Sequence, residues 1–230
     1  MKNCLVQFYM PTDGFADPEF VNIKVNQELL EYSKSSSRIY ADKCGTDYIL
    51  VDKPRINHVH PTFERFDLFF NQGWWKEYDQ ILYLDTDVIC WPDAPNVFDM
   101  YPDNKKFKIC EDRTALKKSA RWHKQQEKQT ILSQFDSEII RSRRFNAGVF
   151  MLNSYSAGLI APHLKYKEHS DDDNRILIYA VLASGVETES MDWRFNKKNG
   201  VTSWFGHGYG QEKYKKDNKL LSVARQIFKI

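Results

Sequence analysis

The stretch Gln80–Leu84 is short, almost wholly apolar and followed at once by Asp85. Such a strand needs cover on both faces, as a central strand of a parallel sheet has. Two similar strands precede it, and stretches with helical spacing separate the three. The expected order is strand 5–9, helix 19–36, strand 48–51, helix 62–78 and strand 80–84. This alternation predicts an α/β fold with a Rossmann-like, mostly parallel central sheet flanked by helices.

The second half of the chain is less regular. We expect strands at 106–110 and 146–153, a polar helical excursion over 116–140, a helix at 173–184 and a loop over 191–210. The serine run Ser35–Ser37 is expected to end the first helix. Because there is no repeat, low-complexity linker or clear boundary, we expect a single domain over 1–230.

The charge balance excludes one class of partner. The 33 basic and 31 acidic residues leave a formal charge of +2, too little for non-specific nucleic-acid binding. A phosphate-bearing small ligand needs only one or two well-placed cations and a metal. The cysteines Cys4, Cys44, Cys90 and Cys110 contain no C-x-x-C pair, which indicates reduced, mostly buried thiols. With no leader-like or membrane-spanning apolar run, we expect a soluble, cytoplasmic chain without an anchor.

The two carboxylates Asp85 and Asp87 follow the central strand directly. In open α/β sheets, ligands bind beyond the carboxyl ends of the strands. Two such carboxylates can hold one hard cation, Mn²⁺ or Mg²⁺, and such ions usually share their site with substrate phosphates. The alternative is a pair of loop or capping carboxylates, since many loops contain Asp-x-Asp. The position directly after a buried strand favours the metal site.

The segment Ile81–Ile89, ILYLDTDVI, resembles the Asp-x-Asp strand of GT-A-fold glycosyltransferases, in particular glycosyltransferase family 8, the glycogenin and bacterial lipopolysaccharide galactosyltransferase type. The resemblance implies that Asp85 contacts the donor's ribose or sugar and helps at the metal, and that Asp87 is a direct metal ligand. It also implies one GT-A domain, with 1–110 as the nucleotide-binding half and 111–230 as the acceptor-side half.

Two further segments carry the same resemblance. Arg65 resembles the family arginine that lies before the Asp-x-Asp strand and reaches the donor sugar; a surface helix arginine is the alternative. Phe145–Asn153, FNAGVFMLN, is similar to the family strand F-N-[AS]-G-V-x-x-x-N. There, Asn146 and Ala147 would contact the donor sugar. Physically, Ala147 and Gly148 would let a ligand approach the backbone closely.

The segment HGYGQEK fits the family's C-terminal pattern H-x-x-G-x-x-K. The resemblance makes His207 the third metal ligand and places Gly210 and Lys213 on the diphosphate. Taken alone, a histidine among glycines is more often a loop residue. The family's usual Pro-Trp after the lysine is replaced by Tyr214 and Lys215, which leaves the path of this loop open.

Asp172, Asp173 and Asn174 occupy the place of the family's D-Q-D-like segment. The resemblance assigns Asp172 to the acceptor or to orienting the sugar, and puts Asp173 in the place of the family glutamine near the reacting carbon. A carboxylate there can act as nucleophile or base, or can stabilise an oxocarbenium-like centre. A register shifted by one residue, which uses Asp171, stays open.

The loop after the first strand is expected to bind the nucleotide base through Tyr9 and Thr12, although it does not match the family motif closely. His58 and His60 form an H-x-H without an evident third ligand, which favours a loop role. A fainter resemblance is to the compact glycosyltransferases of large algal DNA viruses, so a virus-encoded enzyme in a host cytoplasm is a further expectation.

The predicted function is metal-dependent transfer of a sugar from a nucleotide-diphosphate sugar, a UDP-sugar, to a glycan or other hydroxyl acceptor, with retention of configuration. A sugar nucleotidyltransferase is one alternative, but it should carry a G-x-G-x-R loop where this chain has Pro11–Gly14. A non-catalytic carbohydrate-binding protein with structural calcium is the other. Calcium normally recruits more oxygen ligands than this segment offers.

Overall fold

A computed structural model of the protein describes residues 1–10, 26–56, 61–111, 117, 119, 121, 128, 130–142, 144–165, 172–198, 200–208 and 219–229. The predicted positions Thr12, His58, His60, Gly210 and Lys213 lie outside these ranges. None of the described helices is long and apolar enough to cross a membrane. The four cysteines, all within the described ranges, are free thiols, and three of them are buried.

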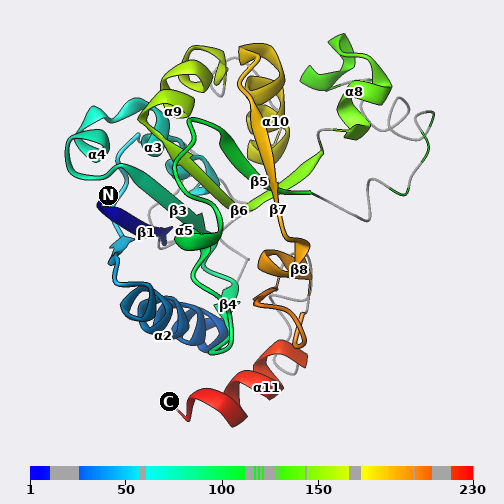
Figure 1. Cartoon of the computed structure of the whole chain (residues 1–230). Helices are drawn as coiled ribbons and strands as arrows, with labels where there is room; N and C mark the ends of the chain where they lie inside the picture. The colour runs from blue at the N-terminus through cyan, green and yellow to red at the C-terminus, as the bar shows by residue number, and fades with distance from the viewer. Residues whose placement is uncertain are drawn as a thin grey trace.

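The described residues contain a central six-stranded sheet with the order β2-β1-β3-β6-β5-β7 (Figure 1). Its strands are β1 (Asn3–Phe8), β2 (Asp47–Val51), β3 (Gln80–Leu84), β5 (Phe107–Glu111), β6 (Phe145–Asn153) and β7 (Thr188–Met191). Among these strands, β6 alone runs antiparallel to its neighbours, β3 and β5. The predicted mostly parallel α/β sheet is confirmed.

The strand β3 is buried along its whole length, as its apolar sequence predicts. Ile81 and Tyr83 belong to a core on one face of the sheet. Leu82 and Leu84 belong to a core on the other face. The strand β3 therefore runs between two hydrophobic cores, one on each face of the sheet. Asp85, the residue that follows it, lies at the edge of the sheet where the strand ends.

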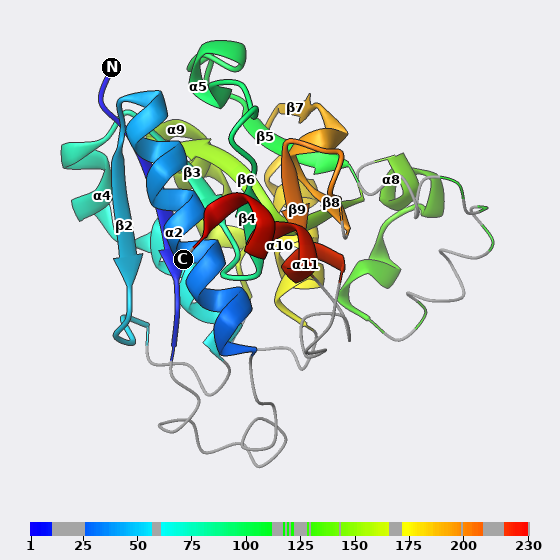
Figure 2. The ribbon, with the colours of Figure 1, turned by 90° about the horizontal axis from the view of Figure 1, so that it is seen from below.

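Helices cover both faces of the sheet (Figure 1). One face carries the helical segments η2 (Pro61–Phe66), α3 (Asp67–Phe70), α4 (Gln72–Glu77), α9 (Ser154–Ile160), η4 (Ala161–His163) and α10 (Asp173–Ser184). The other face carries α2 (Gln27–Cys44), against which α11 (Lys219–Phe228) packs (Figure 2). Three further short segments are α5 (Val97–Met100), η3 (Ile131–Gln134) and α8 (Ser137–Ser142).

The helix α2 ends later than the sequence predicts, and residues 19–25 of the predicted helix lie outside the described ranges. Asn26 caps its start by accepting from the backbone N–H groups of Glu28 and Leu29, and Gly45, at φ 63°, ends it in the left-handed region. The serine run Ser35–Ser37 does not stop the helix. Ser36 and Ser37 are buried, and Ser36 accepts a hydrogen bond from the backbone N–H of Cys90 at 3.2 Å. These serines therefore lie on the buried side of the helix, where they contact the residues packed against it.

Two other elements differ from the prediction. The expected helix 62–78 is divided into η2, α3 and α4, because Asn71 has extended dihedrals and caps α4 through Gly73 N–H. The expected loop 191–210 contains η5 (Trp193–Phe195), β8 (Lys197–Lys198) and β9 (Phe205–His207). With β4 (Val88–Cys90), these strands form a second sheet in the order β4-β9-β8. Strands of two or three residues are too short to show an alternating pattern.

Candidate functional site

Asp85 is the first residue after β3, and three backbone contacts hold it there. Its N–H donates to the carbonyl of Gly148 on β6 at 2.8 Å. Its carbonyl accepts from the side chain of Gln7 at 3.1 Å and from the N–H of Val88 at 3.1 Å. The backbone thus turns tightly from β3 into β4, and Asp87 lies inside that turn.

The second sheet brings His207 to this turn. In the antiparallel pairing of β4 with β9, His207 lies opposite Val88. The N–H of Gly208 donates to the carbonyl of Asp87 at 2.8 Å. The pairing therefore places a histidine from near the end of the chain beside a carboxylate from its first half.

Three ligand-type side chains converge at this point. His207 Nε2 lies 3.0 Å from Asp87 Oδ1 and 3.6 Å from Asp85 Oδ2. The three residues offer ligand atoms within 4.8 Å of one another. The His207 side chain is 1% exposed, whereas those of Asp85 and Asp87 are 25% and 13% exposed. Two carboxylates open to one side and a buried imidazole behind them form a group that can hold a divalent cation.

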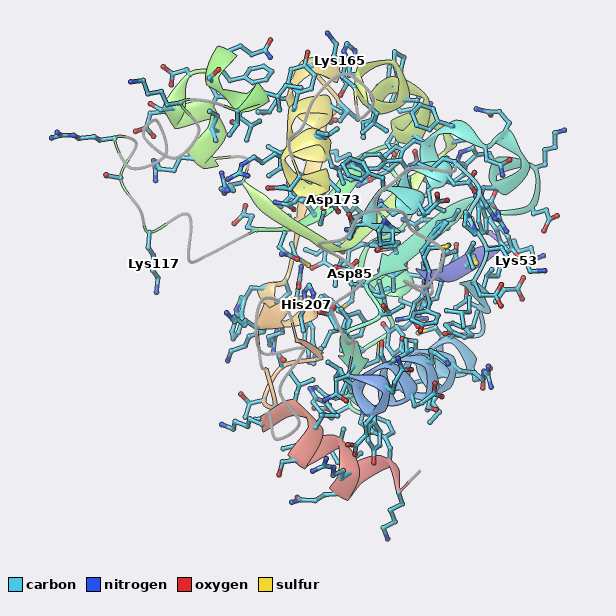
Figure 3. The ribbon with its side chains drawn as sticks, turned by 180° about the vertical axis from the view of Figure 1, so that it is seen from behind. Lys53, Asp85, Lys117, Lys165, Asp173 and His207 are labelled. Carbon is cyan, nitrogen blue, oxygen red and sulfur yellow. The ribbon has the colours of Figure 1, made fainter. Side chains whose placement is uncertain are left out.

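Arg65 is the centre of a second group. It is buried, and its Nη2 lies 3.1 Å from Asp85 Oδ1 and 2.9 Å from Asp173 Oδ2. Its Nη1 donates to the carbonyl of Ala147 at 2.8 Å. The alternative of a surface helix arginine is therefore wrong. Figure 3 shows Asp85 between Asp173 on the α10 side and His207 on the other.

Burial and charge act against each other in this group. Burial alone would lower the pKa of Arg65, but the carboxylates of Asp173 and Asp85 outweigh it and raise that pKa. Burial raises the pKa of Asp173, and the guanidinium of Arg65 only partly opposes the shift. Arg65 therefore stays charged and links the predicted metal ligand to the predicted catalytic carboxyl group.

The strand β6 contributes through its backbone as well as its side chains. The N–H of Ala147 donates to Asn174 Oδ1 at 2.7 Å, so both backbone groups of this residue are bound by protein. Asn146 Oδ1 accepts from the N–H of Gly148 at 2.9 Å. An added Cβ at Gly148 would lie 2.1 Å from His207 Cε1. The space beside Gly148 is therefore filled by His207, where the sequence predicted a ligand.

Asp172 and Tyr9 occupy different surroundings. Asp172 caps α10 by accepting from the N–H of Arg175 at 2.8 Å, and it also forms an ion pair with that side chain. The structure does not bring it into the Arg65 group. Tyr9 follows β1, and its N–H donates to the carbonyl of Val51 at 2.8 Å. Because β1 and β3 are parallel neighbours, Tyr9 lies at the same sheet edge as Asp85.

Sequence reasoning missed three residues of the site. Tyr83 donates its hydroxyl to Asp85 Oδ1 at 2.5 Å, and its ring lies under Arg65. The apolar sequence of β3 indicates that Tyr83 is buried, but it does not indicate that the Tyr83 hydroxyl binds Asp85. Asn174 binds Ala147 and Asn196 binds His207, and neither contact has a sequence signal because each joins elements far apart in the chain.

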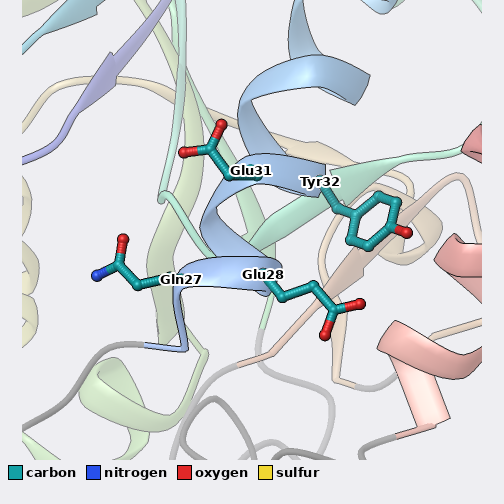
Figure 4. A pocket seen from close by; sticks show the side chains of 4 residues that line it. All are labelled: Gln27, Glu28, Glu31 and Tyr32. Carbon is teal, nitrogen blue, oxygen red and sulfur yellow. The ribbon is translucent and has the colours of Figure 1, made fainter. Parts of the chain in front are cut away.

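A groove of about 290 Å³ lies at the beginning of α2 (Figure 4). It is lined by Gln27, Glu28, Glu31 and Tyr32. Glu28 forms an ion pair with Arg225 of α11 across this region. Its described lining residues are acidic or neutral, and none of them belongs to the Asp85–Asp87–His207 group.

The fold is that of the GT-A glycosyltransferases. It resembles a glycosyltransferase involved in glycosylation of the major capsid of the virus PBCV-1, with a TM-score of 0.59 and 8% identity over 99% of this chain and 100% of that one. It also resembles the galactosyltransferase LgtC, solved with donor and acceptor sugar analogs, with a TM-score of 0.58 and 13% identity over 97% and 94% of the two chains.

A third similar structure is β1,4-galactosyltransferase 7 of Drosophila, solved with manganese, UDP-Gal and xylobiose, with a TM-score of 0.50 and 11% identity over 98% of this chain and 80% of that one. No curated protein sequence matches the chain. Residues 19–156 match the glycosyl transferase family 8, and the chain belongs to this family. The chain is therefore a glycosyltransferase, as predicted, and the nucleotidyltransferase and non-catalytic alternatives are set aside.

Proposed function

We propose that the protein is a metal-dependent transferase that moves a sugar from a nucleotide-diphosphate sugar, a UDP-sugar, to a hydroxyl of a glycan or other acceptor, with retention of configuration. The observation that carries the proposal is the convergence of Asp85, Asp87 and His207 at the carboxyl end of β3. In this fold class, that edge of the sheet is where ligands bind.

The donor set suits Mn²⁺ or Mg²⁺. Two carboxylate oxygens and one imidazole nitrogen would hold the ion, and Asp85 and Asp87 are partly exposed whereas His207 is buried. When bound by these residues, a divalent ion would supply positive charge to the departing diphosphate. On the protein's side, Gly210 and Lys213 would contact the diphosphate, and Tyr9 and Thr12 the base.

The donor sugar would lie against Arg65, Asp85, Asn146 and Ala147. Support comes from the fixed position of Arg65, which is buried and whose Nη2 contacts both Asp85 and Asp173. A guanidinium held in this way loses little freedom when a sugar hydroxyl binds to it. The arrangement therefore favours one orientation of the sugar beside the metal group.

Asp173 would lie beside the anomeric carbon, and Asp172 would orient the acceptor. During transfer, the bond from that carbon to the diphosphate breaks, a bond to the acceptor oxygen forms on the same face, and the proton of the acceptor hydroxyl passes to the departing diphosphate. A carboxylate paired with Arg65 is a weaker nucleophile than an isolated one. We therefore assign Asp173 to stabilising positive charge on the sugar, in place of forming a covalent link to it.

The proposal is tested by melting the protein with UDP. UDP with Mn²⁺ is expected to raise the melting temperature, and UDP with EDTA is not, because the ion joins the diphosphate to the protein. Asp87→Asn should abolish both the metal-dependent shift and turnover of the nucleotide sugar. Asp93→Asn, an exposed loop carboxylate outside the group, is the matched control. Equal stabilisation by UDP in EDTA would refute the metal bridge.

Donor and stereochemistry need a separate measurement. Incubation with a panel of nucleotide sugars should release UDP from one UDP-sugar, and proton NMR of the product should show the anomeric configuration of the donor. Inversion would remove the proposed retention while leaving the metal site standing, and failure of every UDP-sugar to release UDP would contradict the proposed donor.

A further inference from the structure

His207 is held from behind by a short chain of side-chain hydrogen bonds. Its Nδ1 lies 2.6 Å from Asn196 Oδ1. The Nδ2 of Asn196 donates to the backbone carbonyl of Asn146 and to Asn146 Oδ1, each at 3.2 Å. Asn146 Oδ1 in turn accepts from the N–H of Gly148. The histidine is thus connected to the strand β6 through one amide.

The orientation of this amide follows from chemistry. A backbone carbonyl only accepts hydrogen bonds, so the group of Asn196 that faces the carbonyl of Asn146 must be its NH₂. The oxygen of Asn196 then faces His207, and the imidazole must donate to it from Nδ1. In a neutral imidazole with hydrogen on Nδ1, Nε2 carries the lone pair. That nitrogen is the one turned toward Asp85 and Asp87.

We propose that Asn196 is a positioning residue for His207: it holds the imidazole as the Nδ1–H tautomer and so presents the Nε2 lone pair to the divalent cation. The inference rests on the proposed metal site formed with Asp85 and Asp87. Partners of this kind behind a metal-binding histidine fix the ring and raise its basicity. Asn196 would therefore act on metal affinity without touching the cation or the substrate.

The fold fixes Asn196 in this place. It follows η5, whose Phe195 is fully buried, and it precedes β8. In the parallel pairing of β8 with β9, Lys198 lies beside His207. The second sheet thus delivers both the histidine and the amide that orients it. A change at Asn196 is local, because the residue is partly exposed and ends a short element.

The test is Mn²⁺ affinity measured without nucleotide, by isothermal titration and by the loss of the free-ion electron paramagnetic resonance signal. Asn196→Ala should weaken binding about 10–100-fold, as loss of such a partner does. Asn196→Asp keeps an acceptor for His207 but no donor for Asn146, and should bind Mn²⁺ at least about fivefold more tightly than the alanine variant. Asn96→Ala, another partly exposed asparagine that caps α5, is the control.

These outcomes distinguish failure of the proposed metal site from failure of the proposed role of Asn196. If the wild type does not bind Mn²⁺, the proposed metal site fails, and the inference with it. If the wild type binds and Asn196→Ala binds within about threefold of it, only the inference fails. Equal weakening in the alanine and aspartate variants also overturns it, because the effect would then come from the bond to Asn146. Should the alanine variant not melt cooperatively, Asn196→Leu, which matches the amide in shape, replaces it.

Discussion

Gly148→Ala is the substitution whose effect follows most directly from the geometry. Gly148 does not have a positive φ, so alanine can adopt its backbone conformation without strain. The new Cβ would lie 2.1 Å from His207 Cε1, against about 3.5–4.0 Å for carbon atoms in contact, so the ring must retreat by roughly 1.4 Å. Metal–ligand distances tolerate about 0.2 Å. The retreat would remove His207 from the proposed metal site.

The magnitude can be measured in two ways. Overpacking of this kind costs about 1–3 kcal/mol of unfolding free energy, measured by urea denaturation without metal. In the background His207→Ala the ring is gone and only the approach to Asn146 Oδ1, at 2.9 Å, remains, so the same substitution should cost clearly less. The Mn²⁺ affinity of Gly148→Ala should equal that of His207→Ala, and the double variant should bind no more weakly than either.

A matched control exists within the same chain. Gly158, inside α9, has no atom within 4 Å of an added Cβ, so Gly158→Ala should be neutral or stabilise the helix by about 0.5–1 kcal/mol. The reasoning is refuted if Gly148→Ala keeps the Mn²⁺ affinity of the wild type. It is equally refuted if the substitution costs as much stability with His207 absent as with it present.

Two further outcomes concern the Arg65 group. Arg65→Met should lower the free energy of unfolding by about 3 kcal/mol or more, because Asp85 and Asp173 lose the buried cation that pairs with both. Urea denaturation measures this loss, and a value below about 1 kcal/mol would contradict the importance of the two ion pairs. Burial raises the folded-state pKa of Asp173, so the wild type should lose stability relative to Asp173→Asn as pH rises from about 3.9 through that pKa. Denaturation profiles across this range check it, and the opposite slope would refute it.

The parts of the fold that sequence predicts are those with strong local signals. The bounds of β3 and α10 match the expected ranges, because an apolar run and a helical repeat are visible in isolation. The extension of α2 through Ser35–Ser37 has no such signal. Serine usually favours helix ends, and here its burial against the backbone of Cys90 decides the outcome, which is a tertiary contact.

At the site, too, residues with a local sequence signal were predicted and residues placed by tertiary contacts were not. The motif residues Asp85, Asp87 and His207 come together as expected, since their order and spacing carry the family resemblance. The role of Arg65 as a bridge was outside sequence reasoning, because Asp85 and Asp173 approach it from two other elements. Asn196 was missed for the same reason: an asparagine before a lysine pair has no chemical signature until the fold sets it against an imidazole.

The pairing of β4 with β9 has a consequence for how the enzyme is assembled. Asp87 and His207 are separated by more than half of the chain, so this is a long-range contact of the kind that forms late in folding. A nascent or proteolysed chain that lacks β9 therefore has Asp85 and Asp87 but not His207, the third residue of the proposed cation site. Since binding free energy of a metal also counts as folding free energy, an ion bound at the proposed site would hold β9 in place, and catalysis and completion of the fold would begin together.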